Sequence, residues 1–153
     1  MSDALDSLTG LIIPLAGQPL LLPNVAVAEL VGYRVGQTAP RGPEWFIGWA
    51  SWRDQKVPLV DPGLLMGQPP TEGPGTRILI LNAVGGRPGL NFIALRIGGI
   101  PRSRRVLRRE LAATGQAGDF VSQQVQLLDE EQPLLIPDLE AIEQVVTEVL
   151  AAQ

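Results

Sequence analysis

Short apolar runs alternate along the chain with polar or glycine- and proline-rich breaks. Nearly every residue from 45 to 52 is apolar, four polar residues follow at 53–56, and residues 57–60 are apolar again. This pattern predicts a β-hairpin with a cationic tip, in which residues 53–56 form the loop. Pro58 has no N–H to donate, so we expect it at a sheet edge or among the first residues of its strand.

The same strand pattern recurs in both halves of the chain. Further strands are predicted at 11–16, 19–23, 77–84, 90–97, 120–127 and 133–136. Because the halves resemble each other, we interpret residues 1–153 as a single domain with related halves at about 10–67 and 77–150, joined by a linker at 68–76. Five short strands per half close best as a small barrel, which leaves no exposed edge.

Two segments have helical features. Apolar residues recur at helical spacing from Leu139 to Leu150, and Asp138 is placed to cap the first turn, so a C-terminal helix is predicted. Residues 103–113 begin with a capping residue, Ser103, and we expect a helix there as well.

Composition excludes several kinds of site. The 153 residues are 45% hydrophobic, enough to bury a core, and their 17 glycines and 14 prolines are typical of short strands and turns. The absence of cysteine and histidine removes disulfides, thiol chemistry, the usual zinc sites and histidine-based acid–base catalysis. We therefore expect no metal and no cofactor.

Charge and hydropathy favour a soluble, cytoplasmic protein. The net charge of −4 gives no general attraction to nucleic acid or anionic lipid. Residues 1–6 are acidic and lack the basic start of a secretory signal. The longest apolar stretches contain prolines and are too short to span a bilayer, so no membrane insertion is expected.

An enzymatic function finds little support in the sequence. No serine has a histidine to activate it. Glu29 and Asp61 are the only carboxylates beside predicted strands; they could in principle act as an acid–base pair, but nothing in the sequence pairs them. Ion-paired or solvated carboxylates are the favoured interpretation, and we predict that the chain is not an enzyme.

One strongly basic run allows an alternative function. Five arginines fall within residues 102–109: Arg102, Arg104, Arg105, Arg108 and Arg109. They could contact phosphates, as in a small nucleic-acid-binding β-barrel, or form a basic patch for an acidic protein partner. A solvated helix face balanced by local acids such as Glu110 is favoured, because no aromatic residue is interleaved to stack on bases.

The three tryptophans suggest a binding surface. On a strand, Trp45 and Trp49 share one face and Trp52 takes the other. Burial of all three in the core is the usual outcome. However, both faces of this strand are apolar and a small barrel has one interior, so either the second lobe or another protein must cover the outer face.

The hairpin and residues 27–33 together resemble the CheW-like family of coupling proteins from bacterial chemosensory arrays. The family's V-x-E-[IV] stretch corresponds to residues 27–30, with Leu30 in place of isoleucine or valine, and its second-half plan matches 78–81, 90–98 and 135–139. The family's hairpin motif is matched by Pro43, Trp45, Phe46, Gly48, Arg53, Val57, Pro58, Leu59, Val60 and Asp61. The resemblance covers almost the whole chain, but the hairpin is its one specific motif.

Several positions depart from the family pattern. Ser51 replaces an asparagine, Trp52 a leucine and Asp54 a turn glycine, while Pro62 and Arg96 replace the usual residues further along. Aspartate tolerates a left-handed backbone, so the turn can survive. Residues 14–15, 22–29 and 99–102 also resemble the ChpC-type adaptors of type IV pilus chemosensory systems, which act in twitching motility.

The resemblance implies a mostly β fold of two intertwined five-stranded SH3-like barrels with a C-terminal helix, and no catalytic activity. It implies an adaptor that links methyl-accepting chemoreceptors to the regulatory domain of a CheA-like histidine kinase. The family's binding-surface pair carries over to Glu29 and Arg53. Val27, Trp49 and Trp52 would supply apolar contact area beside that pair, and Asp54 would complete the tip.

Overall fold

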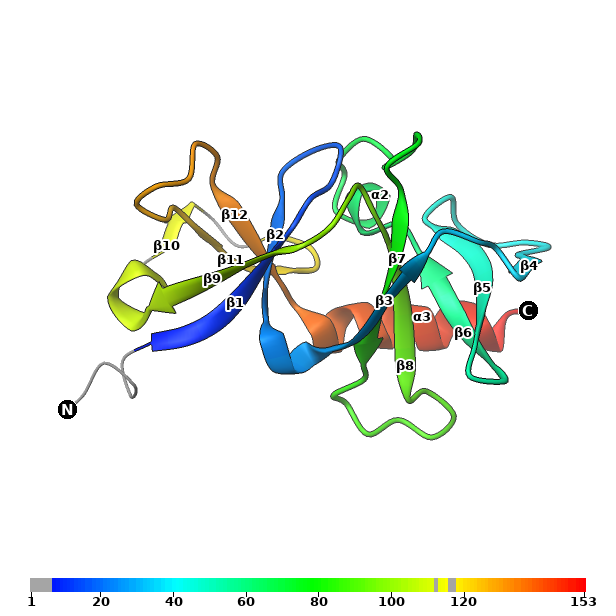
Figure 1. The fold of residues 1–153 in the computed structure, drawn as a ribbon. Helices are drawn as coiled ribbons and strands as arrows, with labels where there is room; N and C mark the ends of the chain where they lie inside the picture. The colour runs from blue at the N-terminus through cyan, green and yellow to red at the C-terminus, as the bar shows by residue number, and fades with distance from the viewer. Residues whose placement is uncertain (1–6, 112, 116–117) are drawn as a thin grey trace.

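The computed structural model describes residues 7–111, 113–115 and 118–153, and these form a mostly β protein (Figure 1). The described residues contain twelve strands in two six-stranded sheets and one long helix at the C-terminus. A mostly β fold with a C-terminal helix is therefore confirmed. No helix among the described residues is long and apolar enough to cross a membrane.

The first half of the chain supplies six strands and two short helical segments. The strands are β1 (Ser7–Ile13), β2 (Leu20–Pro23), β3 (Val27–Gly32), β4 (Gln37–Thr38), β5 (Phe46–Trp52) and β6 (Gln55–Val60). A 3₁₀ turn, η1 (Asn24–Ala26), precedes β3, and the short helix α2 (Pro62–Leu65) follows β6.

The second half also has six strands, one 3₁₀ turn and a final helix. Its strands are β7 (Arg77–Asn82), β8 (Phe92–Ile97), β9 (Arg102–Leu107), β10 (Ala113–Gly115), β11 (Val121–Val125) and β12 (Leu134–Pro137). The 3₁₀ turn η2 (Arg108–Leu111) follows β9, and the helix α3 (Leu139–Ala151) follows β12.

The two halves exchange strands. One sheet, here called the β1 barrel, has the order β10-β11-β12-β2-β1-β9; the other, the β5 barrel, has the order β4-β5-β6-β8-β7-β3. In each, a parallel pair (β12 with β2, β6 with β8) joins strands from opposite halves, and the other pairs are antiparallel. The barrels are thus intertwined, as predicted, with the short strands β4 and β10 added to the five expected for each.

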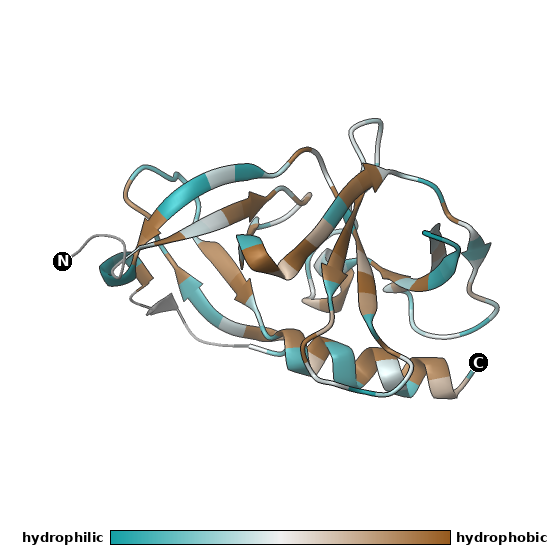
Figure 2. Ribbon diagram, turned by 60° about the horizontal axis from the view of Figure 1, so that its bottom comes forward, coloured by the Kyte–Doolittle hydropathy of each residue, from teal (hydrophilic) through white to brown (hydrophobic). Residues whose placement is uncertain are grey.

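Three apolar clusters form the core. Trp52, Leu59 and Ile80 belong to the cluster inside the β5 barrel, and Val106 and Leu134 to the cluster inside the β1 barrel. The third and largest cluster draws residues from both sheets and from α3, so it joins the two barrels. Figure 2 shows brown, hydrophobic segments on several strands of both sheets and at intervals along α3.

Helix α3 begins where the sequence predicts. The Asp138 carboxylate accepts a hydrogen bond from the Ala141 amide at 3.1 Å, which caps the first turn. Ile142 and Val146 are buried in the central cluster. On the next turn the fully buried Glu143 accepts hydrogen bonds from the amides of the β7–β8 loop, which ties that loop to the helix.

The helix predicted at 103–113 is wrong. Residues 102–107 form strand β9, which pairs antiparallel with β1 from Ser7↔Leu107 to Ile12↔Arg102. Val106 points into the β1 barrel and is 3% exposed. Pairing with β1 and burial of Val106 outweigh the local capping signal at Ser103, because strand or helix preference in a short segment yields to tertiary contacts.

The hairpin is confirmed, but its loop and its proline differ from prediction. Gln55 and Lys56 belong to β6, and Trp52 pairs directly with Gln55, so the loop is only Arg53-Asp54. Pro58 is the fourth residue of β6, a strand with neighbours on both sides, which contradicts the expected edge position. It is tolerated because pairing of β6 with β8 begins only at Leu59.

Candidate partner-binding site

A small polar cluster forms where β3 lies next to the tip of the β5–β6 hairpin. Glu29 Oε1 accepts a hydrogen bond from Trp52 Nε1 at 3.0 Å and pairs with Arg53 Nη2 at 3.2 Å. The Arg53 guanidinium lies 4.5 Å from the centroid of the Trp52 ring, in a cation–π contact. Three side chains that the sequence singled out therefore touch one another.

The backbone explains why this cluster forms. Arg53 and Asp54 have φ of 48° and 61°, the left-handed conformations that a two-residue type I′ hairpin turn requires. Aspartate adopts this conformation more readily than most residues, so the turn survives without the family's glycine. In β3, a register shift between Val27 and Glu29 marks a bulge, a feature that redirects the side chains of a strand.

The charges of this pair remain accessible. The side chains of Arg53 and Glu29 are 67% and 43% exposed, so water screens their attraction and the pair adds little to stability. Trp52, in contrast, is 6% exposed and stacks edge-to-face on Phe92 with ring centroids 4.8 Å apart. The buried Trp52, packed on Phe92, thus supports the exposed Glu29–Arg53 pair.

The other two residues predicted to supply apolar contact area, Val27 on β3 and Trp49 on β5, face the central cluster. Trp49 packs edge-to-face on Phe46, and both Trp49 and Val27 contact the central cluster. Trp45 contacts that cluster too, so Trp45 and Trp49 face one cluster and Trp52 another, as predicted, although Trp45 precedes β5 and a register shift lies between Phe46 and Gly48. Of the two predicted covers for this face, the second lobe or another protein, the structure shows the first, because the central cluster contains residues of both barrels.

A cavity opens beside Trp52. It holds about 520 Å³ and lies between β3 and β5, with the isoleucines of β7 at its base. Its lining is formed by Val31, Gly32, Arg34, Val35, Gly36, Ala50, Ser51, Trp52, Ile78 and Ile80. Apolar side chains and one exposed cation, Arg34, therefore adjoin the charge pair.

Asp61 forms a second, buried ion pair. It is fully buried and binds Arg96 Nη2 at 2.7 Å and Arg96 Nε at 3.0 Å, while the Leu64 and Thr71 amides donate to it. Burial lowers the pKa of Arg96, but hydrogen bonds to Asp61 and Tyr33 outweigh this effect and raise it. Both Glu29 and Asp61 are ion-paired with arginines, which agrees with the prediction that these carboxylates are ion-paired or solvated and do not form an acid–base pair.

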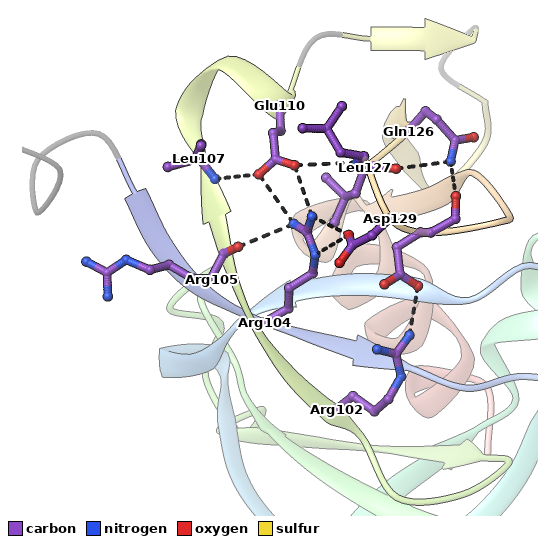
Figure 3. A network of polar contacts seen from close by, with 10 residues as sticks. Arg102, Arg104, Arg105, Leu107, Glu110, Gln126, Leu127 and Asp129 are labelled. Carbon is purple, nitrogen blue, oxygen red and sulfur yellow. Dashed lines mark hydrogen bonds and ion pairs between the residues drawn. The ribbon is translucent and has the colours of Figure 1, made fainter.

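The basic run is partly neutralised by carboxylates of the same chain. Arg104 binds Asp129 at 2.6 Å and Glu110 at 3.0 Å, and Arg102 binds Glu130 at 2.7 Å (Figure 3). The hydrogen bond from Arg104, with a second from the Leu107 amide, lowers the pKa of Glu110 to about 2. The local acids thus reduce the charge that the run offers to phosphates, while Arg105, Arg108 and Arg109 are exposed.

Comparison with known proteins identifies the family. The sequence matches the CheW-like domain over residues 9–146, which is most of the chain. The chain belongs to the CheW-like family. This match supports an adaptor of the chemotaxis type and fits a non-catalytic protein.

A solved structure shows the same CheW-like fold. The crystal structure of the scaffolding protein TtCheW from Thermoanaerobacter tengcongensis superposes with a TM-score of 0.72 at 17% sequence identity. The match covers 86% of this chain and 84% of that chain. No curated protein matches the sequence.

The sequence did not indicate Phe92 as part of the site, and it marked Arg96 only as a departure from the family pattern. Phe92 supports Trp52 from β8, and Arg96 neutralises Asp61 from the same strand. Neither contact has a local signal in the sequence, because Phe92 meets Trp52 across the β5 barrel and Arg96 meets Asp61 through the parallel pairing of β6 with β8. No group of three or more acidic residues that could hold a metal ion occurs in the part of the chain that the structure describes.

Proposed function

We propose that this CheW-like protein is a non-catalytic adaptor that couples methyl-accepting chemoreceptors to a CheA-like histidine kinase by direct binding. The observation that supports this role most is the contact of Glu29 and Arg53 at the hairpin tip, where the family's binding-surface pair is expected. We further propose, from the ChpC-type resemblance, that the protein acts in the cytoplasm in the control of twitching motility.

The properties of the hairpin tip suit recognition of another protein. An exposed ion pair orients a partner and favours correct charge patterns, but it supplies little affinity by itself. Affinity comes from burial of apolar area, which the adjoining cavity and the edge of Trp52 can supply. The geometry therefore combines a source of orientation with a source of affinity on one surface.

Reconstitution tests the coupling role. Purified kinase, a membrane preparation of its receptor and this protein are combined, and kinase autophosphorylation is measured with and without receptor ligand. We expect the receptor to control the kinase only when the protein is present, and we expect the Arg53→Glu variant to restore much less control. Receptor control that is equal with and without the protein contradicts the coupling role.

A further inference from the structure

A second cleft lies away from the hairpin tip. It holds about 500 Å³ between the β1–β2 loop and the β11–β12 loop, which both lie at the top of the view in Figure 1, whereas the β5–β6 turn lies at the lower right. We call it the acidic cleft. Its lining residues are Pro14, Leu15, Gly17, Pro19, Arg102, Asp129, Glu130, Glu131 and Gln132.

The two walls of the acidic cleft differ in chemistry. The β1–β2 loop contributes Pro14, Leu15 and Pro19, which form an apolar wall. The β11–β12 loop contributes three consecutive carboxylates, from Asp129 to Glu131. Such a cleft can accept the aliphatic stem of a long cationic side chain on one wall and its charged end on the other.

The charges around the cleft do not balance. Arg102 pairs with Glu130, and Arg104 is shared between Asp129 and Glu110. The charged residues that line the cleft are one cation, Arg102, and the three carboxylates from Asp129 to Glu131, of which Glu131 is exposed and forms no ion pair with any other described residue. Arg105 alternates to the opposite face of β9. An excess of two negative charges therefore remains at the cleft, which favours a cationic partner.

Exposed apolar side chains come from the segments that flank the cleft. Leu128 immediately precedes the acidic wall and is 86% exposed. Ile100, two residues before Arg102 in the β8–β9 connection, is 64% exposed. A partner that contacted both segments could bury this area, which charge attraction alone would not do.

Hydrogen bonds hold both walls in place. On the acidic side, Gln126 Nε2 donates to the Glu130 carbonyl at 2.6 Å and Arg104 holds Asp129 (Figure 3). On the apolar side, the Ala16 amide donates to Thr71 Oγ1 at 3.1 Å. A cleft whose walls are already ordered loses less conformational entropy when a ligand binds.

We propose that the acidic cleft binds an extended basic segment of a partner protein, in which lysine or arginine alternates with apolar residues. The cations pair with Glu131 and the neighbouring carboxylates, and the apolar side chains pack on Pro14, Pro19 and Leu128. This surface goes beyond the proposed adaptor function, because it is separate from the Glu29–Arg53 pair. It would bind a basic segment, whereas the basic run at 102–109 would bind an acidic partner.

The test uses a short labelled peptide in which lysines alternate with leucines, and an acidic counterpart with glutamates in place of lysines. Titration of the full chain is followed by peptide fluorescence anisotropy and by amide chemical shifts of the isotope-labelled protein. We expect saturable binding of the basic peptide alone, weaker at high salt, with shifts at residues 14–19 and 128–132. Glu131→Lys should weaken it about fivefold or more, the effect of losing about 1 kcal/mol of charge interaction.

Two control variants, of which Glu44→Lys is matched in charge, separate this proposal from the adaptor function. Glu44→Lys makes the same charge change at an exposed site outside the cleft, and Arg53→Glu alters only the hairpin tip; both should leave peptide affinity unchanged. The proposal is overturned if Glu44→Lys weakens binding as much as Glu131→Lys, if both peptides bind equally, or if the shifts fall at the β5–β6 turn. None of these results bears on kinase coupling.

Discussion

Asp61 shows how strongly one buried carboxylate depends on one cation. The side chain is 0% exposed and Arg96 is 13% exposed, so water screens this pair far less than the Glu29–Arg53 pair. The same carboxylate caps α2 and accepts the Thr71 amide, so it also ties residues 68–76 to the β5 barrel. Arg96 departs from the family pattern, and its position against Asp61 gives that departure a structural role.

Replacement of Arg96 by methionine tests this dependence. Arg96→Met leaves the Asp61 charge buried with two amide donors, so we expect the free energy of unfolding to fall by about 3–5 kcal/mol. The exposed Arg105→Met is the control and should change it by less than about 0.5 kcal/mol. Urea unfolding measures both, and equal midpoints for the two variants would contradict the role assigned to this pair.

Among the elements, β9 shows best what local sequence does not determine. Its arginines, serine and valine carry no strong strand pattern, and Ser103 is a good helix cap, so the helix prediction was reasonable but wrong. The deciding contacts are with β1, whose paired residues run from Ser7↔Leu107 to Ile12↔Arg102 and so lie far away in the sequence. By contrast, α3 and the β5–β6 hairpin carry their own signals, the Asp138 cap and a polar break between apolar strands, and both were predicted.

The candidate site, like the fold, was predictable only in part. Glu29 and Arg53 could be paired only through the family resemblance, since Glu29 lies on β3, which is not a neighbour of β5 or β6 in the sheet order, and Arg53 lies in the turn between β5 and β6. The hydrogen bond from Trp52 and the support from Phe92 could not be predicted, because they depend on the curvature that brings β3, β5 and β8 around one cluster. The sequence therefore indicated which residues could form the site, but not how they contact one another.

The ion pairs that link β9, η2 and the β11–β12 loop should weaken as the pH falls. Because the pKa of Glu110 is about 2 in the folded protein, against 4.5 ordinarily, its contribution to stability is complete above about pH 4.5 and is lost as the pH falls toward 2. Arg104 also lowers the pKa of Asp129, which acts in the same direction.

Removal of Arg104 should reduce this acid sensitivity. We expect the unfolding free energy of Arg104→Met to decline less than that of the parent protein between about pH 4.5 and pH 2, followed by urea unfolding at each pH. Arg102→Met, which removes a partner of Glu130 only, serves as the comparison. Identical slopes for the parent and Arg104→Met would show that this network does not govern the acid response.

At the scale of the whole molecule, exchange of strands joins the two barrels. β1 and β2 from the first half complete the barrel of β9–β12, and β7 and β8 from the second half complete that of β3–β6. The central cluster takes side chains from both sheets and from α3. Neither barrel can therefore unfold without removing strands or core contacts from the other, which favours a single cooperative transition.

One leucine in each barrel tests this coupling. Leu59 and Leu134 are 0% and 1% exposed and belong to different clusters, and we expect either alanine variant to lower the unfolding free energy by about 2–5 kcal/mol. Hydrogen exchange should show the loss of protection in amides of both barrels for each variant. Protection that falls only in the mutated barrel would mean that the barrels unfold independently.

The most direct test of the adaptor account is the affinity of this protein for the regulatory domain of a CheA-like histidine kinase from the same cell, measured by calorimetric titration. The account predicts saturable binding that Arg53→Glu weakens by about tenfold, a loss of about 1.4 kcal/mol, with a nearly unchanged thermal melt because the pair is exposed. Arg105→Glu, an equal charge change on β9, should bind as the parent does. No binding by the parent protein, or equal binding by parent and Arg53→Glu, would contradict the account.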